Sequence, residues 1–300
     1  MKLLVLGAKG FIGSNLVQYF KNLGDEVISC DVKAIANEPG YFMVQRKESD
    51  YDSIFSQHKP DACIYAGGNG SVPLSLEQPD LDYSLNVNNV FRILQTISKY
   101  HPGCKFIHLS SAAVYGNPVH LPISEGALIR PLSPYGWHKY IAEILCKEFH
   151  TLKAIPTCSL RIFSVYGEGL KKQLFWDIYN KSLQNDKLEL FGTGNESRDF
   201  IYVGDLSRAI DCILQSASFQ GESINVSSGV ETKIADAAAT FLKHYKPLTS
   251  LLFNQKAKPG DPVNWRADIS KLKSYGFEYS ISLQEGLLRY SQWLKENESH

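Results

Sequence analysis

The first twenty residues contain the feature that most narrows the possible folds. Residues 4–6 are a short apolar strand, residues 7–13 carry Gly7, Gly10 and Gly13, and apolar residues then recur at helical spacing through residue 20. A strand, a glycine-rich turn and a helix in this order form a phosphate-binding unit, because the turn lets backbone approach a diphosphate and the helix N-terminus points N–H groups at it. We therefore expect a dinucleotide to lie against this turn, including Phe11 and Ile12.

An acidic residue follows the glycine-rich turn at a sequence distance that suits binding of a ribose. Residues 26–30 form a second strand that ends at Asp31. A carboxylate roughly 20 residues beyond such glycines accepts hydrogen bonds from an adenosine ribose. Its charge repels a 2′-phosphate, which favours NAD over NADP, and Lys33 lies close enough to weaken that preference. The alternative is an Asp that opens a loop as an ordinary turn former.

The first half of the chain alternates strands and helices. Residues 61–65 form a strand, residues 81–100 form a long helix with one apolar side, and residues 105–109 form a strand that leads to Ser111. Repeated strand–helix units predict an α/β fold with a Rossmann-like, doubly wound parallel sheet. The small-residue loop that begins at Gly67 is either a place where backbone lies against a cofactor or a plain flexible connection.

The second half of the chain has shorter and more polar segments. Residues 223–226 are a candidate strand that returns to the main sheet. We therefore expect residues 1–165 to form an NAD-binding Rossmann domain, with a returning strand near residues 220–230, and residues 166–300 to form mostly a smaller C-terminal substrate-binding lobe. Ligands of open α/β sheets bind at the carboxyl ends of the strands, where this lobe would lie.

A tyrosine and a lysine are spaced for acid–base chemistry. Ser133 is a candidate N-cap and Pro134 a first helical residue, which puts Tyr135 and Lys139 one turn apart on one helix face. A Lys ammonium beside a phenol lowers the phenol pKa from its ordinary ~10 and makes the Tyr a general base. Ser111 would hold the same substrate oxygen. By itself, however, this Tyr–Lys spacing also occurs on ordinary exposed helices.

Charge and cysteine usage narrow the class of partner. The chain has 31 basic and 31 acidic residues, a formal net charge of zero and no run of like charges. This balance argues against nucleic acid and membrane surfaces and favours small molecules. Neither the six cysteines nor the eight histidines show metal-ligand spacing, so we predict no metal site. Scattered thiols, no leader segment and no apolar run near ~18 residues predict a cytoplasmic protein.

These motifs together resemble the extended short-chain dehydrogenase/reductases, in the NAD-dependent sugar epimerase/dehydratase group that includes UDP-glucose 4-epimerase. The resemblance runs nearly end to end. The matching motifs are, in order, Gly7/Gly10/Gly13, Asp31, Asn86-Val87, residues 111–116, Tyr135 with Lys139, residues 160–167, residues 198–201 and Gly260-Asp261.

The resemblance implies a role for each of these residues. Ser111, Tyr135 and Lys139 would carry out redox chemistry with NAD, and Lys139 would also hydrogen-bond the nicotinamide ribose. Asn86 would lie in the cofactor site, and Arg198 would hold the diphosphate of a nucleotide-linked sugar, of which a UDP-sugar is favoured. Arg suits this task because its fork matches phosphate oxygens. The long helices near residues 85 and 141 would pair across a homodimer.

Departures from the family pattern indicate which reaction to expect. Ser164 stands where Asn is frequent and Lys258 where Arg is common, so both are expected in the substrate pocket with altered contacts. Ala112 and Ala113 stand where sugar 4,6-dehydratases carry an Asp-Glu pair. Two methyl groups cannot move the protons that elimination requires.

The sequence thus predicts an NAD-dependent epimerase that acts at C4 of a nucleotide-diphosphate sugar through a transient 4-keto intermediate. One alternative is an NAD(P)H-dependent nucleotide-sugar 4-ketoreductase. A third hypothesis, from another class, is a dinucleotide-binding sensor or scaffold without turnover.

Overall fold

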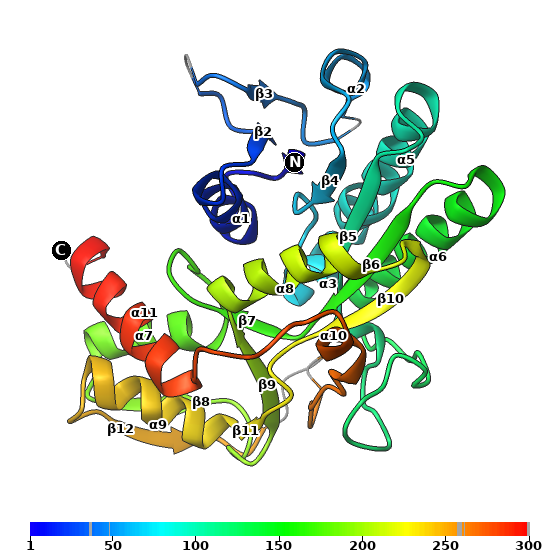
Figure 1. Cartoon of the computed structure of the whole chain (residues 1–300). Helices are drawn as coiled ribbons and strands as arrows, with labels where there is room; N and C mark the ends of the chain where they lie inside the picture. Colours follow the sequence, from blue (N-terminus) through cyan, green and yellow to red (C-terminus); the bar gives the residue numbers. More distant parts are fainter. Residues whose placement is uncertain (36–37, 48, 257–259, 261, 299–300) are drawn as a thin grey trace.

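Seven strands form one parallel sheet in the computed structural model, which describes residues 1–35, 38–47, 49–256, 260 and 262–298. Their order is β10-β6-β5-β4-β1-β2-β3 (Figure 1), and all neighbours run parallel. The predicted doubly wound sheet is therefore confirmed. Chain order reverses between β1 and β4, which is where such sheets bind ligands. The strands are β1 (Lys2–Leu6), β2 (Glu26–Asp31), β3 (Tyr41–Met43), β4 (Ala62–Tyr65), β5 (Lys105–Ser111), β6 (Thr157–Ile162) and β10 (Gln220–Val226).

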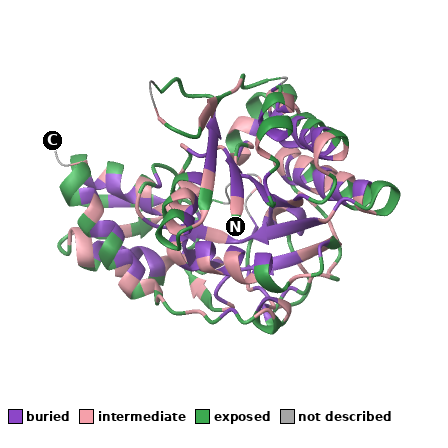
Figure 2. Ribbon diagram, turned by 45° about the horizontal axis from the view of Figure 1, so that its top comes forward, coloured by how far each residue is buried: buried purple, intermediate pink, exposed green. Residues whose placement is uncertain are grey.

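Helices cover both faces of this sheet because its strands are apolar on both sides. In β1, Leu3 packs in one core with Phe20, whereas Leu4 and Leu6 pack in a second core with Ile93. Figure 2 shows the strands buried beneath helices whose outer sides are exposed. One face carries α1 (Phe11–Asn22) and α8 (Val203–Ser216), and the other carries α2 (Asp52–His58), α5 (Asn89–Tyr100) and α6 (Pro134–Lys153). In the described part of the chain, no helix has the length and apolarity needed to span a membrane.

The helix predicted over residues 81–100 is divided into three parts. It consists of α4 (Pro79–Tyr83), a π-helical turn η1 (Ser84–Asn88) and then α5. A π turn widens the helix locally and is frequent at functional sites. Before it, α3 (Val72–Glu77) begins at Ser71, whose hydroxyl accepts a hydrogen bond from Leu74 N at 3.3 Å. This arrangement directs Asn86 of η1 toward the loop that follows β4.

The remaining elements pack beside the carboxyl ends of the parallel strands (Figure 1). An aromatic cluster that includes Tyr166, Phe175, Phe241 and Tyr290 joins them. The Ser282 hydroxyl caps the last helix by accepting from Glu285 N at 3.2 Å. These elements are β7 (Ser164–Tyr166), α7 (Gln173–Gln184), β8 (Lys187–Leu190), β9 (Ser197–Tyr202), β11 (Glu231–Lys233), α9 (Ile234–Tyr245), β12 (Ser250–Phe253), α10 (Ser270–Ser274) and α11 (Leu283–Asn297).

Candidate active site

The glycine-rich turn lies at the carboxyl end of β1, where it meets the loop after β4. Gly7 has a φ of +85°, and a Cβ there would lie 2.5 Å from the backbone nitrogen of Gly67. A Cβ on Gly13 would lie 2.0 Å from the carbonyl oxygen of Gly7. Gly10 caps α1 without any side-chain bond, so the amides of its first turn remain available for an anion. The backbone of these two loops is therefore packed too closely for side chains.

Asp31 ends β2 at the edge of this turn. Its carboxylate accepts hydrogen bonds from Lys9 N at 2.8 Å, from Val32 N at 2.7 Å and from Lys33 N at 3.3 Å. These bonds fix the carboxylate beside the glycine turn. The Lys33 side chain is exposed, while its carbonyl oxygen accepts a hydrogen bond from the Tyr41 hydroxyl.

Ser111, Tyr135 and Lys139 meet where β5 ends and α6 begins. The Ser133 hydroxyl caps α6 by accepting from Gly136 N at 3.3 Å. Lys139 Nζ lies 5.8 Å from the centroid of the Tyr135 ring. The Ser111 hydroxyl forms a hydrogen bond with Tyr135, and it also accepts from a backbone amide at the start of η2 (Ala112–Val114). The three sequence-predicted side chains thus share one end of the sheet.

The pKa of Tyr135 differs from what the sequence predicted. Burial raises the pKa of Tyr135 to about 12, although its hydrogen bond with Ser111 acts in the opposite direction. Burial lowers the pKa of Lys139 to about 8, against the opposing charge of Asp82. The expectation that the ammonium lowers the phenol pKa is wrong for this arrangement. Lys139 Nζ instead donates to the carbonyl oxygen of Leu109 at 2.8 Å, so desolvation dominates at the phenol.

Sequence reasoning missed a buried carboxylate beside these residues. Asp82 is fully buried and accepts from Asn69 Nδ2 at 2.6 Å and from Asn86 Nδ2 at 3.0 Å. Its other oxygen lies 2.5 Å from His138 Nδ1. Asp82 thereby joins the loop after β4, the π turn and α6. The spacing of Asp82 and Asn86, four residues apart within an otherwise apolar helix side, was the available signal.

Asn86 also presents an unpaired acceptor to the site. Within the described residues its Oδ1 is buried and has no hydrogen-bond partner. A Cβ on Gly68 would lie 2.3 Å from this oxygen and 3.2 Å from Lys139 Nζ. The loop backbone at Gly68 therefore lies next to both the amide oxygen and the ammonium. Glycine cradles, free helix amides and an orphaned buried acceptor together fit a dinucleotide with its ribose hydroxyls.

Two of the residues predicted to bind substrate, Ser164 and Arg198, lie on β7 and β9. Ser164 opens β7 and is opposite Phe200 of β9. Arg198 donates to the carbonyl oxygens of Ser197 at 2.8 Å and Val263 at 3.2 Å, and its guanidinium lies 5.6 Å from the centre of the Trp265 ring. Lys258 lies outside the described residues.

The positions after Ser111 carry no acid–base group. Ala112 is fully buried and Ala113 is half-buried in η2. The indole Nε1 of Trp265 donates to the carbonyl oxygen of Gly116 at 3.0 Å, which places the Arg198 face beside this block. The site can therefore orient an oxygen at Tyr135 and Ser111, but its residues at 112 and 113 cannot move a further proton.

Comparison with known proteins gives a consistent result. Residues 3–227 match the model of the NAD dependent epimerase/dehydratase family. A protein of Methanocaldococcus jannaschii named "Putative UDP-glucose 4-epimerase" is 30% identical over 305 residues, which cover 98% of this chain and 99% of that one.

Solved structures of similar proteins share the whole fold. The UDP-glucuronic acid 4-epimerase of Bacillus cereus, solved with UDP-glucuronic acid and NAD, is 28% identical, with a TM-score of 0.88 over 99% of both chains. The UDP-glucose 4-epimerase of Thermotoga maritima, solved with UDP-glucose, is 27% identical, with a TM-score of 0.90 over 100% of both chains.

Proposed function

The chain belongs to the NAD-dependent epimerase/dehydratase family and is an NAD-dependent nucleotide-sugar epimerase, and we propose that it inverts C4 of a UDP-linked hexose or its N-acetylated relative through a transient 4-keto sugar. The observation that carries this proposal is the meeting of Ser111, Tyr135 and Lys139 beside the loop after β4, which packs against the glycine turn, with alanines at positions 112 and 113. These residues support redox chemistry at a hydroxyl-bearing carbon, and the two alanines provide no acid–base group for elimination.

Tyr135 is the proposed acid–base group at the C4 hydroxyl. NAD, when bound, supplies the acceptor and donor of the C4 hydride. Tyr135 takes the hydroxyl proton as C4 is oxidised and returns it after the keto sugar has turned over. The Ser111 hydroxyl positions the reacting oxygen, which develops into a carbonyl oxygen.

Lys139 is proposed to adjust the acidity of Tyr135. Its ammonium is charged below a pH of about 8, and it now faces the carbonyl oxygen of Leu109. A movement of this ammonium toward the phenol would stabilise the phenolate, because an opposite charge nearby favours the ionised form. The same ammonium lies close to the orphaned Asn86 oxygen, where a ribose hydroxyl would complete the hydrogen bonds.

The cofactor and substrate halves of the site are proposed to follow the predicted division of the chain. The turn from Gly7 to Gly13, with Phe11 and Ile12 at the start of α1, would hold the NAD diphosphate. Asp31 would hold the adenosine ribose, and Gly67 and Asn86 would line the nicotinamide side. Residues 1–165 would form the cofactor domain, joined by β10, and residues 166–300 most of the substrate lobe. Within that lobe, Arg198, Ser164 and Lys258 are the proposed contacts of the nucleotide sugar.

We also propose that the protein is a cytoplasmic homodimer. All six cysteines are free thiols and five of them are buried, which suits a reducing compartment. The outer sides of α5 and α6 expose large apolar residues, among them Phe91, Ile144 and Leu152. Pairing of these helices with their copies would cover them.

The test is isotopic and uses the purified protein with UDP-glucose and UDP-N-acetylglucosamine. We expect interconversion with the C4 epimer without added reduced cofactor. In deuterated water the product should carry no deuterium at C4, because hydride moves directly between sugar and nicotinamide. Deuterium at C3 or C5 would show enolisation and refute the C4 assignment. A strict requirement for stoichiometric NAD(P)H with a 4-keto sugar would favour the ketoreductase, and binding without turnover would favour the sensor.

A further inference from the structure

A loop of the proposed substrate lobe approaches both the start of α1 and the loop after β4. This loop, residues 167–172, connects β7 to α7. A Cβ on Gly169 would lie 3.8 Å from the Phe11 ring, at the first residue of α1. At the other end of the loop, a Cβ on Gly70 would lie 3.1 Å from Lys172 Nζ. The 167–172 loop thus extends from the start of α1 to the loop after β4.

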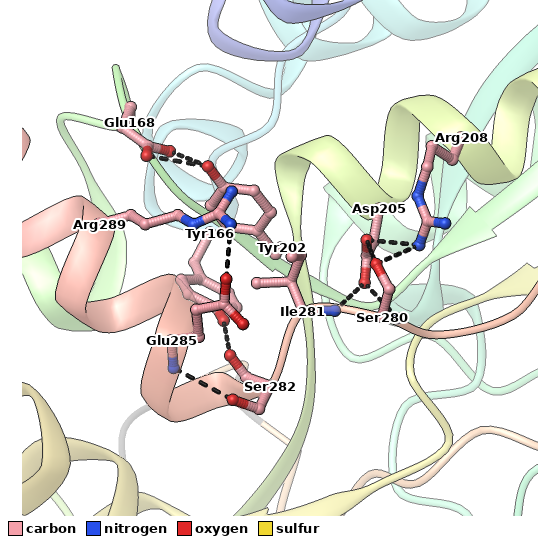
Figure 3. A network of polar contacts seen from close by, with 10 residues as sticks. All are labelled: Tyr166, Glu168, Tyr202, Asp205, Arg208, Ser280, Ile281, Ser282, Glu285 and Arg289. Carbon is pink, nitrogen blue, oxygen red and sulfur yellow. Dashed lines mark hydrogen bonds and ion pairs between the residues drawn. The ribbon is translucent and has the colours of Figure 1, made fainter.

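Side chains of the lobe hold the first part of this loop (Figure 3). The Tyr202 hydroxyl donates to both carboxylate oxygens of Glu168, at 2.8 and 2.7 Å. The Arg289 guanidinium lies 5.6 Å from the centre of the Tyr202 ring and forms an ion pair with Glu285 at 2.5 Å. Glu168 is therefore already occupied by a partner from its own lobe.

The C-terminal helix holds the next two residues from the same side. The Tyr290 hydroxyl donates to the carbonyl oxygen of Leu170 at 2.6 Å, and Lys171 Nζ lies 2.5 Å from Glu298. With both residues held toward α11, Lys172 extends the opposite way, toward Gly70. Gln173, which follows, has a φ of +68°. A non-glycine residue in this region is strained, and such strain is concentrated at ligand-binding segments.

Lys172 places a positive charge near Gly70, with no counter-charge in the part of the chain that the structure describes. Among the described residues its ammonium has no hydrogen bond or ion pair, although the side chain is exposed to solvent. Partial desolvation lowers its pKa, and its charge contributes to the lowered pKa of Lys139. Glu168 of the same loop is engaged with Tyr202, and Asp82, whose charge acts on Lys139, is engaged with His138. The two ammonium groups approach the same loop, Lys139 at Gly68 and Lys172 at Gly70, and two like charges beside one loop favour binding of an anion there.

We propose that Lys172 is a diphosphate-binding residue, which the substrate lobe contributes to the site beside the glycine turn. The inference rests on the proposed function, since that function supplies the diphosphates. Lysine binds phosphate as a point charge and needs no fixed fork geometry. The approach of Gly169 to Phe11 places the loop near the start of α1, where helix amides would meet the cofactor diphosphate. The diphosphate of the nucleotide sugar offers the same chemistry.

The experiment compares ligand binding by three variants after bound nucleotide has been removed. Calorimetric titration with NAD, and separately with UDP, is made for Lys172→Met, Lys172→Arg and a charge-matched control, Lys181→Met. Lys181 lies on α7 and pairs with Asp177 at 2.7 Å. We expect Lys172→Met to weaken NAD binding by roughly ten- to a hundredfold, the usual worth of a charged hydrogen bond. Lys172→Arg should recover most of the affinity, and the control should stay within about twofold.

The two titrations separate the sources of the diphosphate. Loss of NAD affinity assigns Lys172 to the cofactor, whereas loss confined to UDP assigns it to the nucleotide sugar, and either result supports diphosphate binding. Unchanged affinity for both ligands, with an unchanged melting temperature, overturns the inference. Failure of the proposed function is a different result, because it would appear as wild-type protein that binds NAD normally but epimerises no UDP-hexose.

Discussion

Tyr135 is a phenol whose surroundings, before any ligand is considered, oppose its proposed ionisation. Burial raises its pKa to about 12, and only the hydrogen bond with Ser111 acts in favour of the phenolate. The chemistry therefore depends on a cation approaching the ring, and Lys139 is the nearby side chain able to do so. In the proposed mechanism, the Lys139 ammonium therefore has to move from the carbonyl oxygen of Leu109 toward the phenol.

Replacement of Tyr135 by Phe removes the acid–base group and keeps the ring. We expect this variant to fold and bind NAD but to lose about 10²–10⁴ in turnover, the usual contribution of a positioned acid or base. The measurement is kcat for UDP-hexose epimerisation beside an NAD titration. Tyr140→Phe, on the same helix, is the matched control and should keep wild-type turnover. Substantial activity in Tyr135→Phe would remove the assignment.

The buried Lys139 makes the stability of the folded protein increase with pH above a pH of about 8. Its pKa is lowered to about 8 in the folded protein from ~10.4 in the unfolded chain. Between these two pKa values the unfolded state binds more protons than the folded state, so stability rises with pH over this range. Below a pH of about 8, the free-energy cost of burying the charged ammonium is fully present. Lys139→Met removes that cost. We expect its melting temperature, relative to wild type, to be most favourable at pH 7 and to lose that advantage by pH of about 10.

The control for this experiment is Lys181→Met, which removes an exposed ammonium from α7. Its melting temperature relative to wild type should not vary systematically over the same range. A Lys139→Met difference that is constant with pH would show that the ammonium is not destabilised in the folded state.

At the level of elements, one buried carboxylate connects three segments. Asp82 of α4 binds Asn69 of the loop after β4, Asn86 of the π turn and His138 of α6. The last helix also carries Lys139. The relative placement of loop, π turn and helix therefore depends on a single side chain that takes no part in the proposed chemistry.

Asp82→Ala should accordingly be strongly destabilising. Asn69, Asn86 and His138 would lose their buried acceptor, and each buried polar group left unsatisfied costs about 1–3 kcal/mol. The measurement is the free energy of unfolding in urea at neutral pH. Asp80→Ala is the control two residues away, where the side chain is exposed and its nearest ammonium lies at 3.8 Å; it should change stability by less than about 0.5 kcal/mol. Equal effects of the two variants would contradict the role given to Asp82.

At the scale of the whole molecule, the proposed dimer can be tested on the outer face of α6. Ile144 is exposed in the single chain. Ile144→Glu would place a charge within the proposed helix pairing, so we expect light scattering to show the wild-type protein at twice the chain mass and this variant at the chain mass. Leu248→Glu is the control, because Leu248 is 95% exposed in the other part of the molecule. A wild-type protein that is monomeric at micromolar concentration would exclude the dimer.

The sequence by itself determined the parallel sheet, the glycine turn and the helix that starts at Ser133, because each depends on local patterns of periodicity, capping and backbone geometry. Strand–turn–helix order at Gly7 and N-capping at Ser133 act over a few residues, so they are readable without a fold. Membership of the family followed from the same local motifs, which the comparison with known proteins then confirmed.

Only the tertiary structure decided the electrostatics of the site. Desolvation depends on what packs around a group, so the direction of the Tyr135 pKa could not be read from its spacing to Lys139. Contacts between segments that are distant in the sequence could not be predicted from the sequence for the same reason. His138 meets Asp82 across 56 residues, and Lys172 approaches Gly70 across about a hundred, because crossover connections bring the carboxyl ends of separate strands together at one edge of the sheet.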